Sequence, residues 1–136
     1  MIGPVRRTGR EAGAAAVEFV LMSVLLVLLL FGVLQVALYV YARNVVSSAV
    51  ADAARYAATN DPAAGAERAR DLIASGLNHR AAGALRCSGR ADVDAASGLP
   101  TVTVQCRGRI GPAFLPFGLL PLQVDVSSSA LREEQP

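Results

Sequence analysis

A glycine and a glutamate stand at the start of a hydrophobic run, and their types and spacing are the clearest indication of a functional site in this chain. The stretch GAAAVEF places Gly13 five residues before Glu18, and Phe19 follows directly. Placing a carboxylate at the centre of a bilayer costs about 2.5–3.5 kcal/mol of free energy on insertion scales. The presence of Glu18 in such a run therefore requires an explanation. Gly13 breaks a helix and has no side chain, which leaves an uncrowded peptide bond for a protease. A protease that cut after this glycine would break the Gly13–Ala14 bond.

Cleavage at this bond would supply a partner for Glu18. It would create an ammonium group on Ala14, and residues 14 and 18 lie on the same face of a helix. Glu18 could pair with this amine or with the amine of a neighbouring chain, which offsets the cost of removing the carboxylate from water. The alternative is a Glu18 side chain that extends to the lipid headgroups.

Cys87 and Cys106 are the two cysteines of the chain, and they allow a single pairing. Arg6, Arg7 and Arg10 precede the apolar run, so the positive-inside rule places the N-terminus in the cytoplasm and residues 43–136 outside. Cysteines oxidise in such an outside compartment. We therefore expect a disulfide between Cys87 and Cys106.

The other reactive residue types predict no catalytic site and no metal site. His79 is the single histidine and has no second ligand at metal spacing. Ser127–Ser129 carry no nucleophile-elbow signature. The 13 basic residues are all arginine and are scattered, and aromatic residues make up 5% of the chain, which argues against nucleic-acid binding. We expect no enzyme, no cofactor and no small-molecule substrate.

A proline-interrupted stretch, residues 110–122, carries large apolar side chains outside any regular pattern. They are Phe114, Leu115, Phe117, Leu119 and Leu120. Because prolines keep the stretch irregular, we expect a loop. It either folds back over the head or forms an exposed patch for a partner or the membrane surface.

A membrane anchor must position the N-terminal residues. The 24 residues from Phe19 to Ala42 carry no charge, and about 20 apolar residues in a helix cross a bilayer core. Glycine and proline in the first 13 residues argue against a stable helix there. We divide the chain into a basic cytoplasmic leader, 1–13, a transmembrane helix, 14–42, and an extracytoplasmic domain, 43–136.

Past the anchor, the helical pattern continues to about residue 60 and becomes amphipathic. Its apolar stripe is Val46, Ala49, Val50, Ala53 and Ala57, and its polar stripe is Asn44, Ser48, Asp52, Arg55 and Thr59. Asp61 and Pro62 are residue types that cap and start a second helix, which we expect to end near Leu77. The buried stripe of this second helix is Ala66, Ala69, Ile73 and Leu77, helped by Leu72.

Alternation with a period of two predicts short strands in the C-terminal part. Residues 101–110 place Val102, Val104, Cys106 and Ile110 on one face, 122–127 alternate in the same way, and 91–95 are a candidate third strand. Such a small sheet needs the amphipathic part of the long helix as a cover. We therefore expect an α+β fold in which a long N-terminal transmembrane helix continues into a small extracytoplasmic head, with a second helix and a short antiparallel sheet of about three strands.

The order of these features resembles the type IV pilin-like proteins of the tight-adherence (Tad/Flp) class, and the whole chain resembles the TadE-like pseudopilins. The resemblance rests on Gly13, Glu18, Phe19, the adjoining apolar run, and the alternating LQVDVSSSA near the C-terminus. It implies that a membrane-embedded prepilin peptidase cuts after Gly13 and that Glu18 becomes the fifth residue of the mature chain. Since major Flp pilins are much shorter, it implies a minor pseudopilin that acts in pilus structure or assembly.

The resemblance also implies partners and a location. The partners are the membrane, the prepilin peptidase, other pilins or pseudopilins, and Tad inner-membrane assembly proteins. The location is the cytoplasmic membrane, crossed once, where the protein either joins a surface pilus or only aids its assembly. Adhesion and secretion are the functions associated with such pili.

Two other classes of protein stay open. One is an unprocessed single-pass anchor that carries an extracytoplasmic binding domain. The other is a domain secreted after a signal peptide is removed at Ala42, although the apolar run exceeds the usual 7–15 residues. The mature N-terminus separates the classes, because it would be Ala14 for the pseudopilin, the intact leader for the anchor and Arg43 for the secreted domain.

Overall fold

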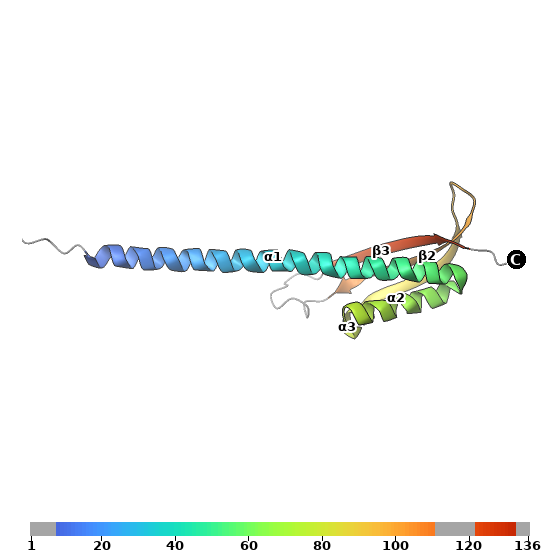
Figure 1. The fold of residues 1–136 in the computed structure, drawn as a ribbon, viewed down its shortest axis with the longest axis horizontal. Coiled ribbons are helices and arrows are strands. Elements are labelled where there is room, and N and C mark those ends of the chain that lie inside the picture. Colours follow the sequence, from blue (N-terminus) through green and yellow to red (C-terminus); the bar gives the residue numbers. More distant parts are fainter. Residues whose placement is uncertain (1–7, 111–121, 133–136) are drawn as a thin grey trace, which may run out of the picture. The chain divides into compact units, whose positions relative to one another are not determined.

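The computed structural model describes residues 8–110 and 122–132. Along the chain the elements are α1 (Thr8–Thr59), α2 (Pro62–Gly76), α3 (His79–Ala84), β1 (Leu85–Val93), β2 (Pro100–Ile110) and β3 (Leu122–Leu131), as Figure 1 shows. This arrangement confirms the α+β class with a long N-terminal helix and a small antiparallel sheet. The chain divides into two compact units, Met1–Ala37, here called the N-terminal unit, and Leu38–Pro136, here called the head.

α1 begins at Thr8, so the prediction that no helix precedes residue 14 is wrong for Thr8–Gly13. Glycine costs about 1 kcal/mol in a helix interior. Extending a helix that already exists gains a hydrogen bond per residue without the cost of nucleation. The long apolar helix therefore extends into the last residues of the leader.

Within the head, α1 follows the predicted amphipathic pattern. All five residues of the predicted apolar stripe are buried, and Ala42, Ala54 and Ala58 join them. All five residues of the predicted polar stripe are exposed. The small side chains of this stripe allow a neighbouring helix to approach α1 closely.

α2 packs closely against this stripe of α1. Asp61 has the extended backbone of an N-cap, φ −87° and ψ 138°, and Pro62 starts the helix, although the Asp61 side chain accepts no capping hydrogen bond. Gly65, Ala66, Ala69 and Ile73 are buried. A Cβ atom on Gly65 would lie 2.6 Å from the Cβ of Ala57 in α1, so only glycine fits this crossing. Leu77, predicted in the helix, lies just past its end as the C-cap.

The sheet has the order β1-β2-β3, and both pairs are antiparallel. The strand predicted at 91–95 is confirmed for residues 91–93 but begins earlier, because β1 spans Leu85–Val93 and pairs Cys87 with Cys106. Gly89 occupies an inward position of β1, where a Cβ would collide with the carbonyl oxygen of Pro62. A glycine at an inward position interrupts the apolar alternation by which strands are recognised in a sequence.

α3 is a short helix that the sequence analysis missed. Asn78 is its N-cap, and its side-chain oxygen accepts a hydrogen bond of 2.7 Å from the Ala81 amide. Asparagine before an alanine-rich stretch is a helix-start signal. The shortness of the helix, six residues, and Gly83 within it hid the signal.

The turn between β1 and β2 begins at Asp94, directly after the end of β1 at Val93. The Asp94 carboxylate accepts hydrogen bonds from the Ser97 hydroxyl at 2.6 Å and from the Ser97 amide at 3.0 Å. These hydrogen bonds, the hydroxyl first, lower the pKa of Asp94. Gly98 has φ +67°, a conformation in which glycine avoids the cost of a side chain.

The core of the head lies between the helices and one face of the sheet. Its largest fully buried side chains are Ile73, Val46, Val50, Val102, Val104 and Cys106. The opposite face of the sheet is polar and carries Arg86, Arg90, Thr103, Gln105, Arg107 and Asp125. The described residues contain no buried polar side chain, so burial of small apolar groups holds this head together.

Candidate functional site

The predicted processing and pairing residues lie together on one stretch of α1. Gly13, Ala14, Glu18 and Phe19 belong to this helix, and all four are exposed. Ala14 and Glu18 are four residues apart and therefore share a helix face. The structure thus gives the segment the spacing that an amine–carboxylate pair would use.

Gly13 is surrounded by open space. A Cβ atom built on it would meet nothing within 4 Å, and its φ is not in the left-handed region. Since α1 begins at Thr8, the Gly13–Ala14 peptide bond lies inside a helix. A protease that binds an extended substrate must unwind the helix here, and glycine lowers the cost of unwinding by about 1 kcal/mol relative to alanine.

Glu18 forms no ion pair with any described residue of the chain. Its neighbour Phe19 is 74% exposed. Ser23 lies in the apolar run, where its hydroxyl donates a 2.7 Å hydrogen bond to the Phe19 carbonyl. This bond removes one unsatisfied donor from the run, while the Glu18 carboxylate remains open to a partner.

The rest of the N-terminal unit offers a continuous apolar surface. α1 is long and apolar enough to cross a membrane, and none of its most apolar stretch is buried. Leu25, Leu26, Leu29 and Leu30 are each at least 60% exposed. Such a surface is stable in lipid and costly in water, so α1 fits a single-pass membrane anchor.

In the head, Cys87 and Cys106 are joined by a disulfide between directly paired residues of β1 and β2. Their Cα atoms are 4.0 Å apart, and both side chains are buried on the helix-facing side of the sheet. The bond ties the edge strand to the central strand. The predicted processing residues, Gly13 and Ala14, belong to the other unit.

Two hydrogen bonds in the head escaped the sequence analysis. Arg70 in α2 donates from Nη2 to the Cys87 carbonyl at 3.0 Å, and the Tyr41 hydroxyl donates to the Gly76 carbonyl at 3.2 Å. The first bond joins α2 to β1, and the second joins α1 to α2. Tyrosine at the end of an apolar run is typical of a membrane interface, but its partner in α2 is not readable from the sequence.

The remaining candidates add no chemistry to the site. The predicted apolar patch, Phe114, Leu115, Phe117, Leu119 and Leu120, lies outside the described residues. His79 is exposed as the first residue of α3. Within residues 8–110 and 122–132, no three His, Cys, Asp or Glu side chains form a group that could hold a metal ion.

Fold and site together define a class: a protein with one apolar N-terminal helix that fits a membrane anchor and a small disulfide-containing α+β head. Residues 13–55 match the family model of TadE-like proteins, which confirms the predicted resemblance and makes the chain TadE-like over that segment. The match supports a component associated with the Tad pilus. No curated protein and no solved structure matches the chain.

Proposed function

We propose that this chain is a minor pseudopilin of a Tad-type pilus, processed by a prepilin peptidase after Gly13. The observation that carries the proposal is the family match itself. It begins at Gly13, the residue predicted to precede the cut, and it extends through Glu18 and the apolar run to Arg55. A segment that starts at the processing point and contains the anchor is what such a pilin must share with its relatives.

The proposed cut is a hydrolysis of the Gly13–Ala14 amide. One water molecule is consumed, Gly13 keeps the new carboxylate, and Ala14 receives the new amine, which is protonated at neutral pH. The amine appears four residues before Glu18, at the edge of the apolar surface of α1. Pairing of these two charges, within one chain or between neighbours, offsets the cost of placing each in the membrane.

The proposed location is the cytoplasmic membrane, with the leader in the cytoplasm and the head outside. Arg6, Arg7 and Arg10 before the apolar run support this orientation. The disulfide in the head is in keeping with an oxidising compartment. Other pilins or pseudopilins and inner-membrane assembly proteins would then meet the apolar helix within the membrane and the head outside it.

The apolar patch of residues 114–120 is the proposed contact of the head with a partner or with the membrane surface. The segment connects Ile110 at the end of β2 with Leu122 at the start of β3. Replacing Phe114 and Phe117 with serine should leave the disulfide intact and weaken co-purification with pilus components. An unchanged yield of those components would exclude the partner role and leave the membrane surface or the head's own packing.

The test of the main proposal is the mass of the mature chain. The protein is produced in cells with and without a prepilin peptidase, and its intact mass and N-terminal residue are determined. The proposal expects Ala14 as first residue only when the peptidase is present. A full-length chain in both cases contradicts processing and supports the unprocessed anchor with an extracytoplasmic binding domain. A chain that starts at Arg43 supports signal-peptide removal.

A further inference from the structure

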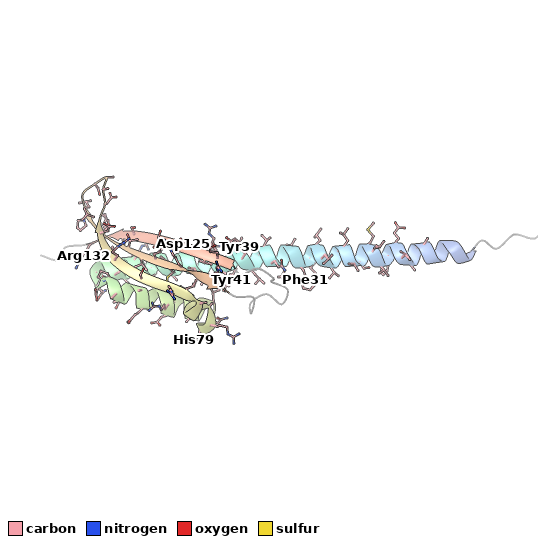
Figure 2. All side chains as sticks on the ribbon, turned by 180° about the vertical axis from the view of Figure 1, so that it is seen from behind. Phe31, Tyr39, Tyr41, His79, Asp125 and Arg132 are labelled. Carbon is pink, nitrogen blue, oxygen red and sulfur yellow. A yellow bond between two sulfur atoms is a disulfide. The ribbon has the colours of Figure 1, made fainter. Side chains whose placement is uncertain are left out.

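Several elements of the head meet at the end where the head begins, at Leu38 of α1. The Tyr41–Gly76 hydrogen bond brings the end of α2 there. Tyr39, Arg43 and residues 123–126 line one hollow, so the start of β3 also lies at this end. The register pairs Leu122 at the start of β3 with Ile110 at the end of β2, and it pairs Gly108 with Leu85 at the start of β1. The end of β2 and the start of β1 therefore lie at this same end. Figure 2 shows Tyr39, Tyr41, His79 and Asp125 together at this end of the head and Arg132 at the other.

Four arginines surround this end, and we call them the arginine collar: Arg43, Arg80, Arg86 and Arg109. Arg43 and Arg80 stand on helices α1 and α3, and Arg86 and Arg109 stand on the outer face of the sheet. All four are exposed. None of the four forms an ion pair with a described residue.

Negative charge does not balance the collar. Asp125 lies at this end, but its carboxylate pairs with Arg107 at 3.2 Å. Asp61, Asp92 and Asp94 lie at the opposite end, in the α1–α2 connection and near the β1–β2 turn. Asp52, Glu67 and Asp71 lie between the two ends, and Asp52 pairs with Arg68 at 3.5 Å. The collar is therefore a site of concentrated, unneutralised positive charge.

We propose that the arginine collar docks the head onto an anionic lipid surface. The collar lies at the end of the head that begins at Leu38, directly after the N-terminal unit in the sequence, and α1 is long and apolar enough to cross a membrane. Guanidinium groups form bidentate hydrogen bonds with lipid phosphates. Tyr39 and Tyr41, at the same end, are of the type that resides among headgroups. This inference is independent of the pilus role, since it needs only an anchored head.

The strength of docking follows from the charge of the membrane. Each arginine near an anionic surface changes the docked-to-free ratio about fivefold at low salt. The attraction decays over a screening length of about 10 Å at 0.1 M salt and about 3 Å at 1 M. Docking should therefore depend on anionic lipid and weaken in salt.

The test uses the full chain reconstituted in vesicles of phosphatidylcholine alone or with phosphatidylglycerol. A fluorophore is attached through Gly83→Cys in α3, where a Cβ meets nothing within 4 Å and where the natural cysteines are held in their disulfide. A headgroup-attached nitroxide quenches the fluorophore on near contact. We expect stronger quenching with phosphatidylglycerol and loss of this gain at about 1 M salt. A label at Ala96→Cys, in the turn at the far end, should show no such gain.

Two matched triple variants locate the effect. Arg80→Gln/Arg86→Gln/Arg109→Gln should remove most of the gain in quenching. Arg55→Gln/Arg90→Gln/Arg132→Gln removes the same charge from exposed positions outside the collar and should keep it. Equal quenching of the unchanged protein in the two lipids overturns the proposal without any substitution. Equal loss in both variants assigns the effect to net charge and overturns the role of the collar.

Discussion

At the scale of residues, Gly13 and Glu18 can be replaced without disturbing the packing of the head. Gly13 is surrounded by open space, so the fold tolerates a larger side chain there. Glu18 is exposed on an apolar helix and has no ion-pair partner among the described residues. Substitutions at both positions therefore report on processing and assembly and not on the folding of the head.

Gly13→Leu should leave a full-length chain in cells that carry the peptidase, because a bulky side chain would block the peptidase site. Gly13→Ala is the matched control, since alanine strengthens the helix by about 1 kcal/mol relative to glycine but adds only a methyl group. Intact-mass measurement separates the two causes. An uncut Gly13→Ala chain would attribute resistance to helix stability, and a cut Gly13→Leu chain would contradict the proposed site.

Glu18→Ala and Glu18→Gln should insert into the membrane at least as well as the natural chain but fail to assemble. Removing a charge lowers the cost of insertion, by at most about 2.5–3.5 kcal/mol, whereas the new amine of Ala14 would lose its partner. Membrane fractionation and pilus yield are measured together. Normal piliation in both variants would replace the pairing role with a carboxylate that extends to the headgroups.

At the scale of elements, the head depends on close approach between helices with small side chains. Gly65 lies where α2 crosses α1, near Ala57 and Ala53, and the side chain of Val104 in β2 is the third neighbour. Gly83 in α3 has open space instead. The two glycines therefore respond differently to the same substitution.

Gly65→Ala should destabilise the head by about 1–3 kcal/mol, because the new methyl group lies 2.6 Å from the Ala57 Cβ and the helices must separate. Gly83→Ala should be neutral or stabilise by up to about 1 kcal/mol, since it gains helix propensity without a clash. Urea-dependent proteolysis of the head in detergent compares them. Equal stability of the two variants would mean that α1 and α2 do not meet at Gly65.

Replacing both Cys87 and Cys106 with serine should give a protease-sensitive head on an intact anchor. The disulfide closes a loop with a sequence separation of 19 residues, and loops near this size contribute about 3 kcal/mol in the chain-entropy model. Thiol alkylation of the natural protein without reductant is the direct measurement. Free reaction of both cysteines in protein from membranes would contradict the bond.

At the scale of the whole molecule, one continuous helix carries two different surfaces. Its N-terminal part is exposed and apolar, and its part after Leu38 buries one stripe against the head. Ala42 is buried and Tyr41 bonds to α2, so residues assigned by sequence to the membrane span belong to the packed head. The exact membrane boundary stays a prediction, and the packing boundary lies at Leu38.

The orientation of the molecule should depend on the leader. In membranes that lack the peptidase and whose outer face is accessible, added protease should digest the head of the Cys87→Ser/Cys106→Ser variant while the leader remains protected. Exchanging Arg6, Arg7 and Arg10 for glutamine leaves Arg43 as the nearest basic residue to the apolar run, which should increase the fraction with the head inside. Protection of the head in the Cys87→Ser/Cys106→Ser variant with the natural leader would contradict the orientation.

The sequence by itself determined the features that depend on neighbours along the chain. The apolar run of α1, its amphipathic continuation and the start of α2 at Pro62 follow from hydrophobic period and residue type. The alternation of β2 followed in the same way. The helical spacing of Gly13 and Glu18 followed as well, because both belong to α1, and their role in processing is a prediction.

Only the tertiary structure decided the features that depend on contacts between distant segments. β1 begins at Leu85 because Cys87 pairs with Cys106 and because the Gly89 backbone packs against Pro62, neither of which produces a local pattern. Glycine disfavours a helix interior, but Gly65 is the point where two helices touch. The arginine collar gathers residues from α1, α3, β1 and β2, so it exists only once the sheet register and the helix packing have brought these elements to one end.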